Sequence, residues 1–164
     1  MTKVLVVSDN HGSLHMIKKI INIEKPQYVI HAGDFCVSKS EIESLVDMYV
    51  AGNNDYDGKD LEKFSIEEVN ILLTHGHQYS SLFNHDKWLE RLSNEAIANN
   101  CQVVIYGHSH KEEIAKVNGV SIINPGSINY PRNKNRTPSY AILEINRDKM
   151  KTNIQYINKS SNWY

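Results

Sequence analysis

Residues 3–12 read KVLVVSDNHG, an apolar run that stops abruptly at a polar turn. An apolar run of this length is typical of a buried strand. After the turn, apolar residues recur at helical spacing until the chain approaches Pro26. The stretch therefore predicts a strand, a turn rich in functional groups and a helix.

The same order of apolar strand and polar turn recurs further along the chain. Strands that end in polar turns are predicted at 27–31, 48–51, 69–73 and 103–106. Helices are predicted at 40–46 and about 86–98, hairpins at 64–73 and 114–123, and final strands at 140–145 and 152–157. Early strand–helix units followed by hairpins predict an α/β (α+β) fold, in which a two-sheet β-sandwich is flanked by helices. No repeat or linker divides the sequence, so we expect residues 1–164 to form a single domain.

Composition narrows the classes of function. Nineteen acidic residues face eighteen basic ones, so the net charge of -1 offers no broad attraction for nucleic acid or an anionic membrane. The apolar run at residues 4–7 is too short for a secretory signal, and no run reaches membrane length. Two cysteines imply no disulfide framework. We expect a cytoplasmic protein, and the oligomeric state stays open.

Five of the eight histidines lie in three short clusters, each just past the end of a predicted strand. The clusters are His11, His75 with His77, and His108 with His110. Turns after other strands carry Asp34, Asn53 and Asn124 in the same position. Because ligands bind beyond the carboxyl ends of strands in sheet-based folds, we expect these side chains to converge on one point.

Converging imidazoles, carboxylates and an amide oxygen are ligands for divalent transition metals. The seven candidates are Asp9, His11, Asp34, Asn53, His75, His108 and His110. One ion usually takes three or four protein ligands, so this set predicts two ions with one shared carboxylate. Two ions roughly 3.5–4 Å apart can clamp the attacking and leaving oxygens of a displacement and lower the pKa of a bridging water. Manganese, iron, cobalt, nickel and zinc all suit these ligands.

The order of the motifs resembles that of the calcineurin-like metallophosphoesterases. The resemblance lies in Asp9-Asn10-His11, Gly33-Asp34, Gly52-Asn53-Asn54-Asp55, Thr74-His75-Gly76-His77 and Gly107-His108-Ser109-His110. The short length and Asn124-Pro125-Gly126-Ser127 are similar to the small YfcE-type phosphodiesterase branch. The resemblance implies a metallophosphoesterase fold and hydrolysis of small phosphate esters, above all phosphodiesters. The attacking group would be a hydroxide that bridges two divalent ions, with manganese as the expected metal.

The resemblance also implies a role for each site residue. Asp9, His11 and His110 would hold the first ion. Asn53, His75 and His108 would hold the second, and Asp34 would bridge the two. Asp55 would support the ligands from behind, and with Asn54 it completes the candidate catalytic pair.

Asn54 departs from the wider superfamily, in which the metal-binding Asn is often followed by His. An amide can donate a hydrogen bond, but it cannot deliver a proton near neutral pH. The sequence therefore predicts a preference for substrates with good leaving groups.

Simpler explanations exist for single motifs. Asp9 alone could cap the following helix, and Gly33-Asp34 alone could be an ordinary turn. A non-catalytic interaction scaffold and a nuclease remain alternative functions. Four further groups are expected to be structural: His15 and His31 at the surface or in packing, Cys36 as a bystander thiol, Trp88 in helix packing, and Arg132, Lys134 and Arg136 in a solvated loop.

Overall fold

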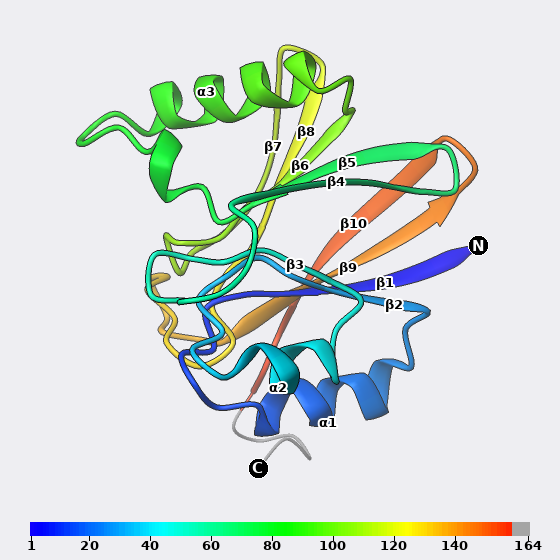
Figure 1. Ribbon diagram of the computed structural model, residues 1–164. Coiled ribbons are helices and arrows are strands. Elements are labelled where there is room, and N and C mark those ends of the chain that lie inside the picture. Colours follow the sequence, from blue (N-terminus) through cyan, green and yellow to red (C-terminus); the bar gives the residue numbers. More distant parts are fainter. Residues whose placement is uncertain (159–164) are drawn as a thin grey trace.

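The computed structural model describes residues 1–158, in which two five-stranded sheets pack face to face (Figure 1). The first sheet has the strand order β10-β9-β1-β2-β3. Its strands are β1 (Thr2–Val7), β2 (Tyr28–His31), β3 (Met48–Tyr49), β9 (Ser139–Asn146) and β10 (Lys149–Tyr156). Strands β1, β2 and β3 run parallel, whereas β9 is antiparallel to both β1 and β10.

The second sheet has the order β4-β5-β6-β8-β7. Its strands are β4 (Leu61–Ile66), β5 (Val69–Thr74), β6 (Val103–Ile105), β7 (Glu112–Val117) and β8 (Val120–Pro125). Strands β5, β6 and β8 run parallel in the middle, and the antiparallel β4 and β7 form the edges. The β-sandwich predicted from the sequence is confirmed.

Helices cover the outer face of each sheet (Figure 1). The first sheet is covered by α1 (His15–Glu24) and α2 (Lys39–Glu43), and the second by α3 (His85–Ala98). A single 3-10 turn, η1 (His77–Tyr79), precedes α3. No helix among residues 1–158 is long and apolar enough to cross a membrane.

Alternate residues of β1 serve two different cores. Val4 and Val6 point into the central core between the sheets, while Leu5 and Val7 pack on the other face with Ile17 of α1. All four β1 residues are fully buried. Because successive side chains of a strand point to opposite faces, burial on both faces requires the continuous apolar run seen in the sequence.

The helix predicted at 40–46 is shorter than expected, since α2 ends at Glu43. The following residues are drawn towards β2, because Asp47 donates its backbone N–H to the Val29 carbonyl and accepts the Val29 N–H through its side chain. The other predicted elements are present, and their ends shift by only a few residues.

The two sheets bring six strand ends to one side of the molecule. The carboxyl ends of β1, β2 and β3 in the first sheet lie near those of β5, β6 and β8 in the second (Figure 1). Each of the six predicted polar turns follows one of these six parallel strands, or in the case of Asn124 ends it. The topology therefore gathers residues from segments up to about a hundred positions apart.

Candidate metal centre

Two groups of candidate ligand atoms converge beyond the strand ends. The first contains Asp9, His11 and His110, and the second contains Asp9, Asp34 and His75. Within each group the ligand atoms all lie within 4.8 Å of one another. The two Nε2 atoms of His11 and His110 face each other at 3.2 Å.

The two carboxylate oxygens of Asp9 differ in their surroundings. Oδ2 accepts hydrogen bonds from the Ser8 hydroxyl at 2.7 Å and from the His108 backbone N–H at 3.1 Å. Oδ1 is buried, has no hydrogen-bond partner among residues 1–158, and lies 3.3 Å from His110 Nε2. Leaving a buried carboxylate oxygen unpaired costs free energy, so this atom fits a cation as its missing partner.

Asp34 lies between the two histidine groups. Its Oδ2 is 3.5 Å from His11 Nε2 and 3.4 Å from His75 Nε2. Gly52 packs so tightly against this side chain that a Cβ at that position would lie 2.1 Å from Asp34 Oδ1. Glycine at position 52 therefore makes room for the carboxylate.

Asn53 and His108 complete the arrangement on the side of His75. Asn53 Oδ1 lies 3.1 Å from His75 Nε2 and 3.0 Å from His108 Nδ1. All seven candidate ligands predicted from the sequence are thus brought together, three on the side of His110 and the rest around His75 and Asp34.

Backbone carbonyls orient two of the imidazoles. The Nδ1 atoms of His75 and His110 lie 2.7 Å from the carbonyl oxygens of Ala32 and Tyr130, respectively. A carbonyl can only accept, so Nδ1 carries the proton and Nε2 keeps a lone pair directed into the centre. This tautomer is the one that a metal ligand requires.

Five of the seven candidate ligands have a left-handed backbone conformation, which residues other than glycine rarely adopt. They are Asp9 (φ 55°), His11 (φ 46°), Asp34 (φ 57°), His108 (φ 68°) and His110 (φ 59°). Each such residue costs on the order of 1–3 kcal/mol, and strain of this kind gathers at functional sites. The left-handed backbone conformation at these five residues thus directs their side chains towards one point.

The carboxylates are held in their charged form. Burial alone would raise the pKa of Asp9 and Asp34, but hydrogen bonds and neighbouring histidines outweigh it. The pKa of both groups is therefore lowered, with His110 and Ser8 acting on Asp9, and His75 and Asn54 acting on Asp34.

The histidines respond to the same charges in different ways. Burial lowers the pKa of His75 and His110, yet contacts with the carboxylates raise it overall in both. The charge of Arg132 also acts on His110, in the lowering direction. For His108, burial and the charge on His75 prevail, so its pKa is lowered.

Asn54 and Asp55 contact the ligand loops in two different ways. Asn54 donates hydrogen bonds to Asp34, whereas the Asp55 carboxylate accepts four backbone N–H groups around the loop. These come from Asp34, Phe35, Cys36 and Gly52, at 2.7 to 3.3 Å. Asp55 therefore joins the turn after β2 to the turn after β3, and it acts as a positioning residue.

Two residues contribute more to the centre than their sequence positions indicated. His77 packs beside His75 and His108 with ring centroids 5.4 and 5.9 Å away. Its buried Nδ1 has no hydrogen-bond partner in the part of the chain that the structure describes. Trp88 packs in helix α3 as predicted, but it also donates its indole N–H to the Gly76 carbonyl and lies edge-on to His108. The His-X-His spacing was the only sequence signal for His77, and nothing local marked the second role of Trp88.

His15, His31 and Cys36, which were expected to be structural, do not belong to either group of converging ligand atoms. His15 is exposed on α1, and His31 is fully buried behind the site. His31 accepts the Gly33 N–H through Nδ1 and donates from Nε2 to Asn10 Oδ1 at 2.7 Å. The Cys36 thiol lies 3.8 Å from His11 Nδ1, and burial raises its pKa to about 11, so it is protonated near neutral pH.

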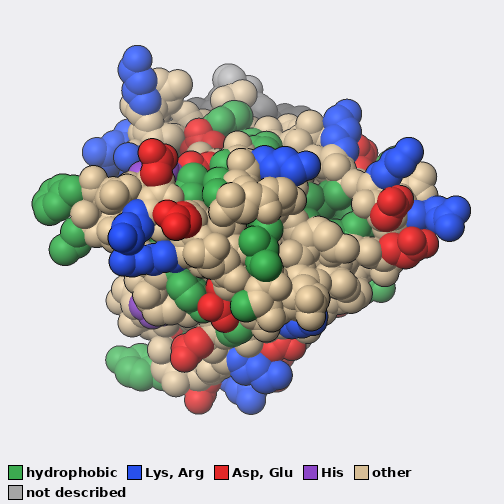
Figure 2. All heavy atoms as spheres, turned by 90° about the horizontal axis from the view of Figure 1, so that it is seen from above, with side chains coloured by type: hydrophobic (Ala, Val, Ile, Leu, Met, Phe, Trp, Pro, Cys, Tyr) green, Lys and Arg blue, Asp and Glu red, His purple; other side chains and the backbone are tan. Residues whose placement is uncertain are grey.

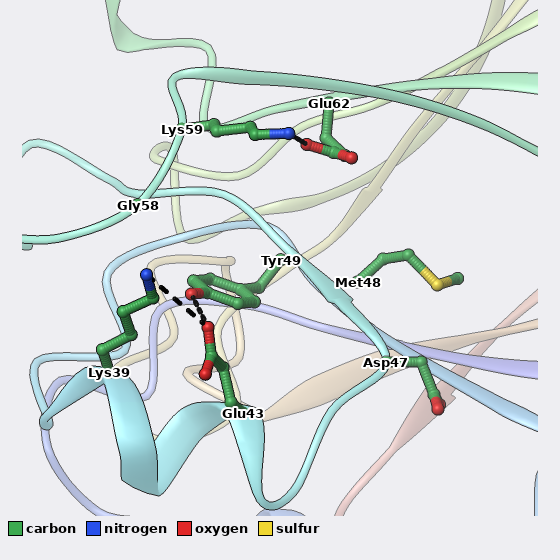
Figure 3. Close-up of a pocket in the computed structure, with 8 residues that line it drawn as sticks. All are labelled: Lys39, Glu43, Asp47, Met48, Tyr49, Gly58, Lys59 and Glu62. Atoms are coloured by element: carbon green, nitrogen blue, oxygen red, sulfur yellow. Dashed lines mark hydrogen bonds and ion pairs between the residues drawn. The ribbon is translucent and has the colours of Figure 1, made fainter.

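A second depression is lined by residues of α2, β3 and β4 and the loops beside them, and none of these ligands lines it (Figure 3). Both of its lysines are paired with a glutamate: Lys39 with Glu43 at 3.9 Å, and Lys59 with Glu62 at 3.1 Å. Tyr49 donates to Glu43 at 2.8 Å. Because both of its lysines already pair with glutamates, this depression is a weaker candidate site than the histidine cluster.

Comparison with known proteins shows the family of the chain. The family model described as the calcineurin-like phosphoesterase superfamily domain matches residues 2–148. The chain belongs to this superfamily. Members share the metal-dependent phosphoesterase architecture, so the family supports phosphoesterase activity and the use of divalent metal by this chain.

Relatives in the superfamily cover at least three quarters of the chain. A probable metallophosphoesterase of Mycoplasma genitalium is 40% identical over 150 residues, which are 92% of this chain and 91% of the relative. A phosphodiesterase of Methanocaldococcus jannaschii is 32% identical over 148 residues, covering 76% of this chain and 82% of its own length.

Solved structures confirm the metallophosphoesterase fold. A Streptococcus pneumoniae protein described as a predicted phosphoesterase superposes with a TM-score of 0.81 at 25% identity, covering 94% of this chain and 89% of its own. Vps29 of Entamoeba histolytica in its zinc complex has a TM-score of 0.71 at 23% identity, covering 94% and 98%. At that identity, the likeness to Vps29 concerns the fold alone.

Proposed function

We propose that this chain is a phosphodiesterase that uses two divalent metal ions. Asp9, His11 and His110 hold the first ion, Asn53, His75 and His108 hold the second, and Asp34 bridges the two. The observation that carries the proposal is the position of Asp34 Oδ2, 3.5 Å from His11 and 3.4 Å from His75. One oxygen facing both histidine groups is what a bridging ligand requires.

The two ions, when bound, would lower the pKa of water and stabilise the charge on the phosphoryl oxygens. The chain's own residues keep the ligands in place. Asn54 holds both oxygens of Asp34, and Asp55 ties the two loops that carry Asp34 and Asn53. Because the ligands are already oriented, no free energy is needed to reorganise them during the reaction.

Hydrolysis would add the oxygen of water to phosphorus while one ester P–O bond breaks, which yields a phosphomonoester and an alcohol or phenol. The position after Asn53 holds an amide, which delivers no proton to the leaving oxygen. Phosphodiesters with acidic leaving groups suit such a site best. The name of the Methanocaldococcus relative, a phosphodiesterase, supports the same substrate class.

Further parts of the proposal rest on chemistry and composition. The mixed histidine, carboxylate and amide ligands suit manganese, with iron, nickel, cobalt or zinc as replacements. We place the protein in the cytoplasm, as one domain over residues 1–164, acting on small phosphate esters.

A nuclease and a scaffold are less well supported. Acidic and basic side chains are interspersed on the face seen in Figure 2, without the extended basic surface that a polymeric nucleic acid requires. A scaffold needs no ligands, yet all seven positions keep coordinating side chains that converge on one centre.

The test is hydrolysis by purified protein that has been stripped of metal and reloaded with manganese. Bis(4-nitrophenyl) phosphate should be cleaved only after reloading, and faster than 4-nitrophenyl phosphate. Protein that binds metal but cleaves neither ester would support the scaffold instead.

A further inference from the structure

An open groove of about 520 Å³ begins at the first ligand group and runs away from it. Its inner end is formed by His11 and His110, and its outer part is formed by residues of the connection between β8 and β9. The outer residues are Tyr130, Pro131, Arg132 and Arg136. The groove therefore joins the proposed metal centre to two arginines.

The connection that carries the arginines is fastened to the centre. Arg132 donates its backbone N–H to the His110 carbonyl at 2.9 Å, and the Tyr130 carbonyl accepts from the His110 imidazole at 2.7 Å. The Tyr130 ring lies edge-on to His11 with ring centroids 5.5 Å apart. Both ligands of the first group that line the groove thus contact this connection directly.

The side chain of Asn133 holds the later part of the same connection in a turn. Asn133 donates to the Thr137 carbonyl at 2.8 Å and accepts the Thr137 N–H at 2.9 Å. The Asn133 side chain also donates to Glu112 Oε2 at 3.0 Å, and the Asn133 backbone carbonyl accepts the Arg136 N–H at 3.1 Å. These bonds fix the backbone from which Arg132 and Arg136 project.

The two arginines differ from the other charged groups near a depression. Within residues 1–158, no carboxylate oxygen lies within 4.0 Å of either guanidinium. Lys39 and Lys59, by contrast, each pair with a glutamate inside their own depression (Figure 3). Lys134, which lies between the two arginines in sequence, lines a separate depression that contains Glu112. The basic residues predicted to lie in one solvated loop therefore line two different depressions. The two arginines lie on the side of the metal centre, and Lys134 does not.

We infer that the groove binds a second phosphate group of the substrate. A guanidinium offers paired N–H donors in a fixed plane that match two phosphate oxygens, and an unpaired guanidinium needs no carboxylate displaced before it binds. The scissile phosphate belongs at the converging ligands, so the arginines are left for an anion further along the same molecule. The substrate class is a phosphodiester in which one organic group carries an additional phosphate. This inference rests on the proposed function and narrows its substrate.

The test compares two probes that differ only in the second phosphate. Thymidine 5′-(4-nitrophenyl phosphate) lacks it, and the 3′-phosphorylated counterpart carries it. The metal-loaded wild type should show a kcat/KM about 10-fold or more higher for the phosphorylated probe, the size expected of a hydrogen bond to a charged group. High salt should shrink this ratio, because the arginines are exposed.

Matched variants assign the preference to the groove. Arg132→Gln and Arg136→Gln should each lower the ratio, and the double variant should bring it near one. The ratio compares the two probes on the same protein, so a change in activity that affects both probes equally does not alter it. Lys134→Gln removes the same charge from the same loop outside the groove and should leave the ratio unchanged. Equal ratios in wild type and the double variant, or an equal loss with Lys134→Gln, would overturn the inference.

A binding measurement separates this inference from the proposed function. Calorimetry should find thymidine 3′,5′-bisphosphate bound about 10-fold or more tightly than thymidine 5′-monophosphate, again lost in the double arginine variant. If neither probe is hydrolysed but this difference is found, the proposed function fails and the groove assignment stands. If both are hydrolysed with equal kcat/KM and the two nucleotides bind equally, only the groove assignment fails. Preferred binding of a long oligonucleotide over the bisphosphate would favour a nucleic-acid partner and contradict the small substrate.

Discussion

Asn54 holds both carboxylate oxygens of Asp34, through its backbone N–H to Oδ1 and its side-chain Nδ2 to Oδ2, each at 2.9 Å. The residue that departs from the superfamily pattern is therefore engaged with the proposed bridging ligand. Its amide orients Asp34 and supplies no acid for the leaving oxygen.

The first prediction concerns this double role of Asn54. Asn54→Ala should lower kcat/KM by about 10–100-fold for all leaving groups, because a partner that orients a metal ligand is lost. Asn54→His should recover activity mainly on esters with poor leaving groups, by at most the roughly 10²–10⁴-fold that an acid contributes. The measurement is the slope of log kcat/KM against the leaving-group pKa in a series of aryl and alkyl phosphodiesters. If wild type already cleaves alkyl monoesters as fast as activated diesters, Asn54 does not set the substrate choice.

The second prediction concerns the number of ions. We expect wild type to bind two divalent ions per chain and Asp34→Ala to keep at most one tightly, because each ion would lose its shared ligand. Manganese titration by calorimetry, with elemental analysis after dialysis, measures both values. Asp57→Ala, an exposed carboxylate in a neighbouring loop, is the matched control and should retain two ions. A variant at position 34 that still binds two ions tightly is incompatible with a bridging Asp34.

The third prediction compares histidines inside and outside the cluster. His75→Ala and His108→Ala should each lower turnover at least ~100-fold, the scale expected when a ligand of the metal clamp is removed. His15→Ala should change little, since that side chain is exposed on α1. Turnover on bis(4-nitrophenyl) phosphate is measured beside the melting temperature. Equal losses in all three variants would mean that the site is misplaced or that the fold is damaged.

The fourth prediction concerns acid stability through His31. Burial lowers the pKa of this imidazole from 6.5 to about 4 in the folded protein, and both ring nitrogens are already satisfied in the neutral form. As pH falls from about 6.5 to about 4, the unfolded chain binds a proton at His31 that the folded chain does not, so the free energy of unfolding falls in that window. The full shift amounts to roughly 3 kcal/mol.

Denaturant unfolding at several pH values measures this linkage. His31→Gln should show a shallower loss of stability between pH 6.5 and 4 than wild type, even where its stability at pH 7 is lower. His15→Gln, which removes an exposed imidazole, should follow the wild-type slope. Parallel curves for wild type and His31→Gln would contradict a neutral, buried His31.

Much of this protein follows from its sequence alone. The apolar run of β1 predicts a strand buried on both faces, because only such a strand needs side chains of one kind at every position. The placement of Asp9 and Asp34 after β1 and β2 predicts their convergence, because parallel strands of one sheet end at the same edge. His75 follows β5 of the second sheet, so the packing of the two sheets brings it to them. Local pattern was therefore enough to predict the fold and to name the seven candidate ligands that the structure brings together.

Only the tertiary structure decided how these groups face one another. The left-handed backbone at Asp9 and His110, the unpartnered Asp9 Oδ1 and the engagement of Asn54 with Asp34 all depend on segments far apart in the chain. The same holds for Arg132 and Lys134, which are two residues apart and line different depressions. Sequence periodicity specifies the face of a helix or strand, but in a loop the direction of a side chain is set by the hydrogen bonds that close it. Those bonds, such as that from Arg132 to the His110 carbonyl, join separate loops and exist only once the strands between them have paired.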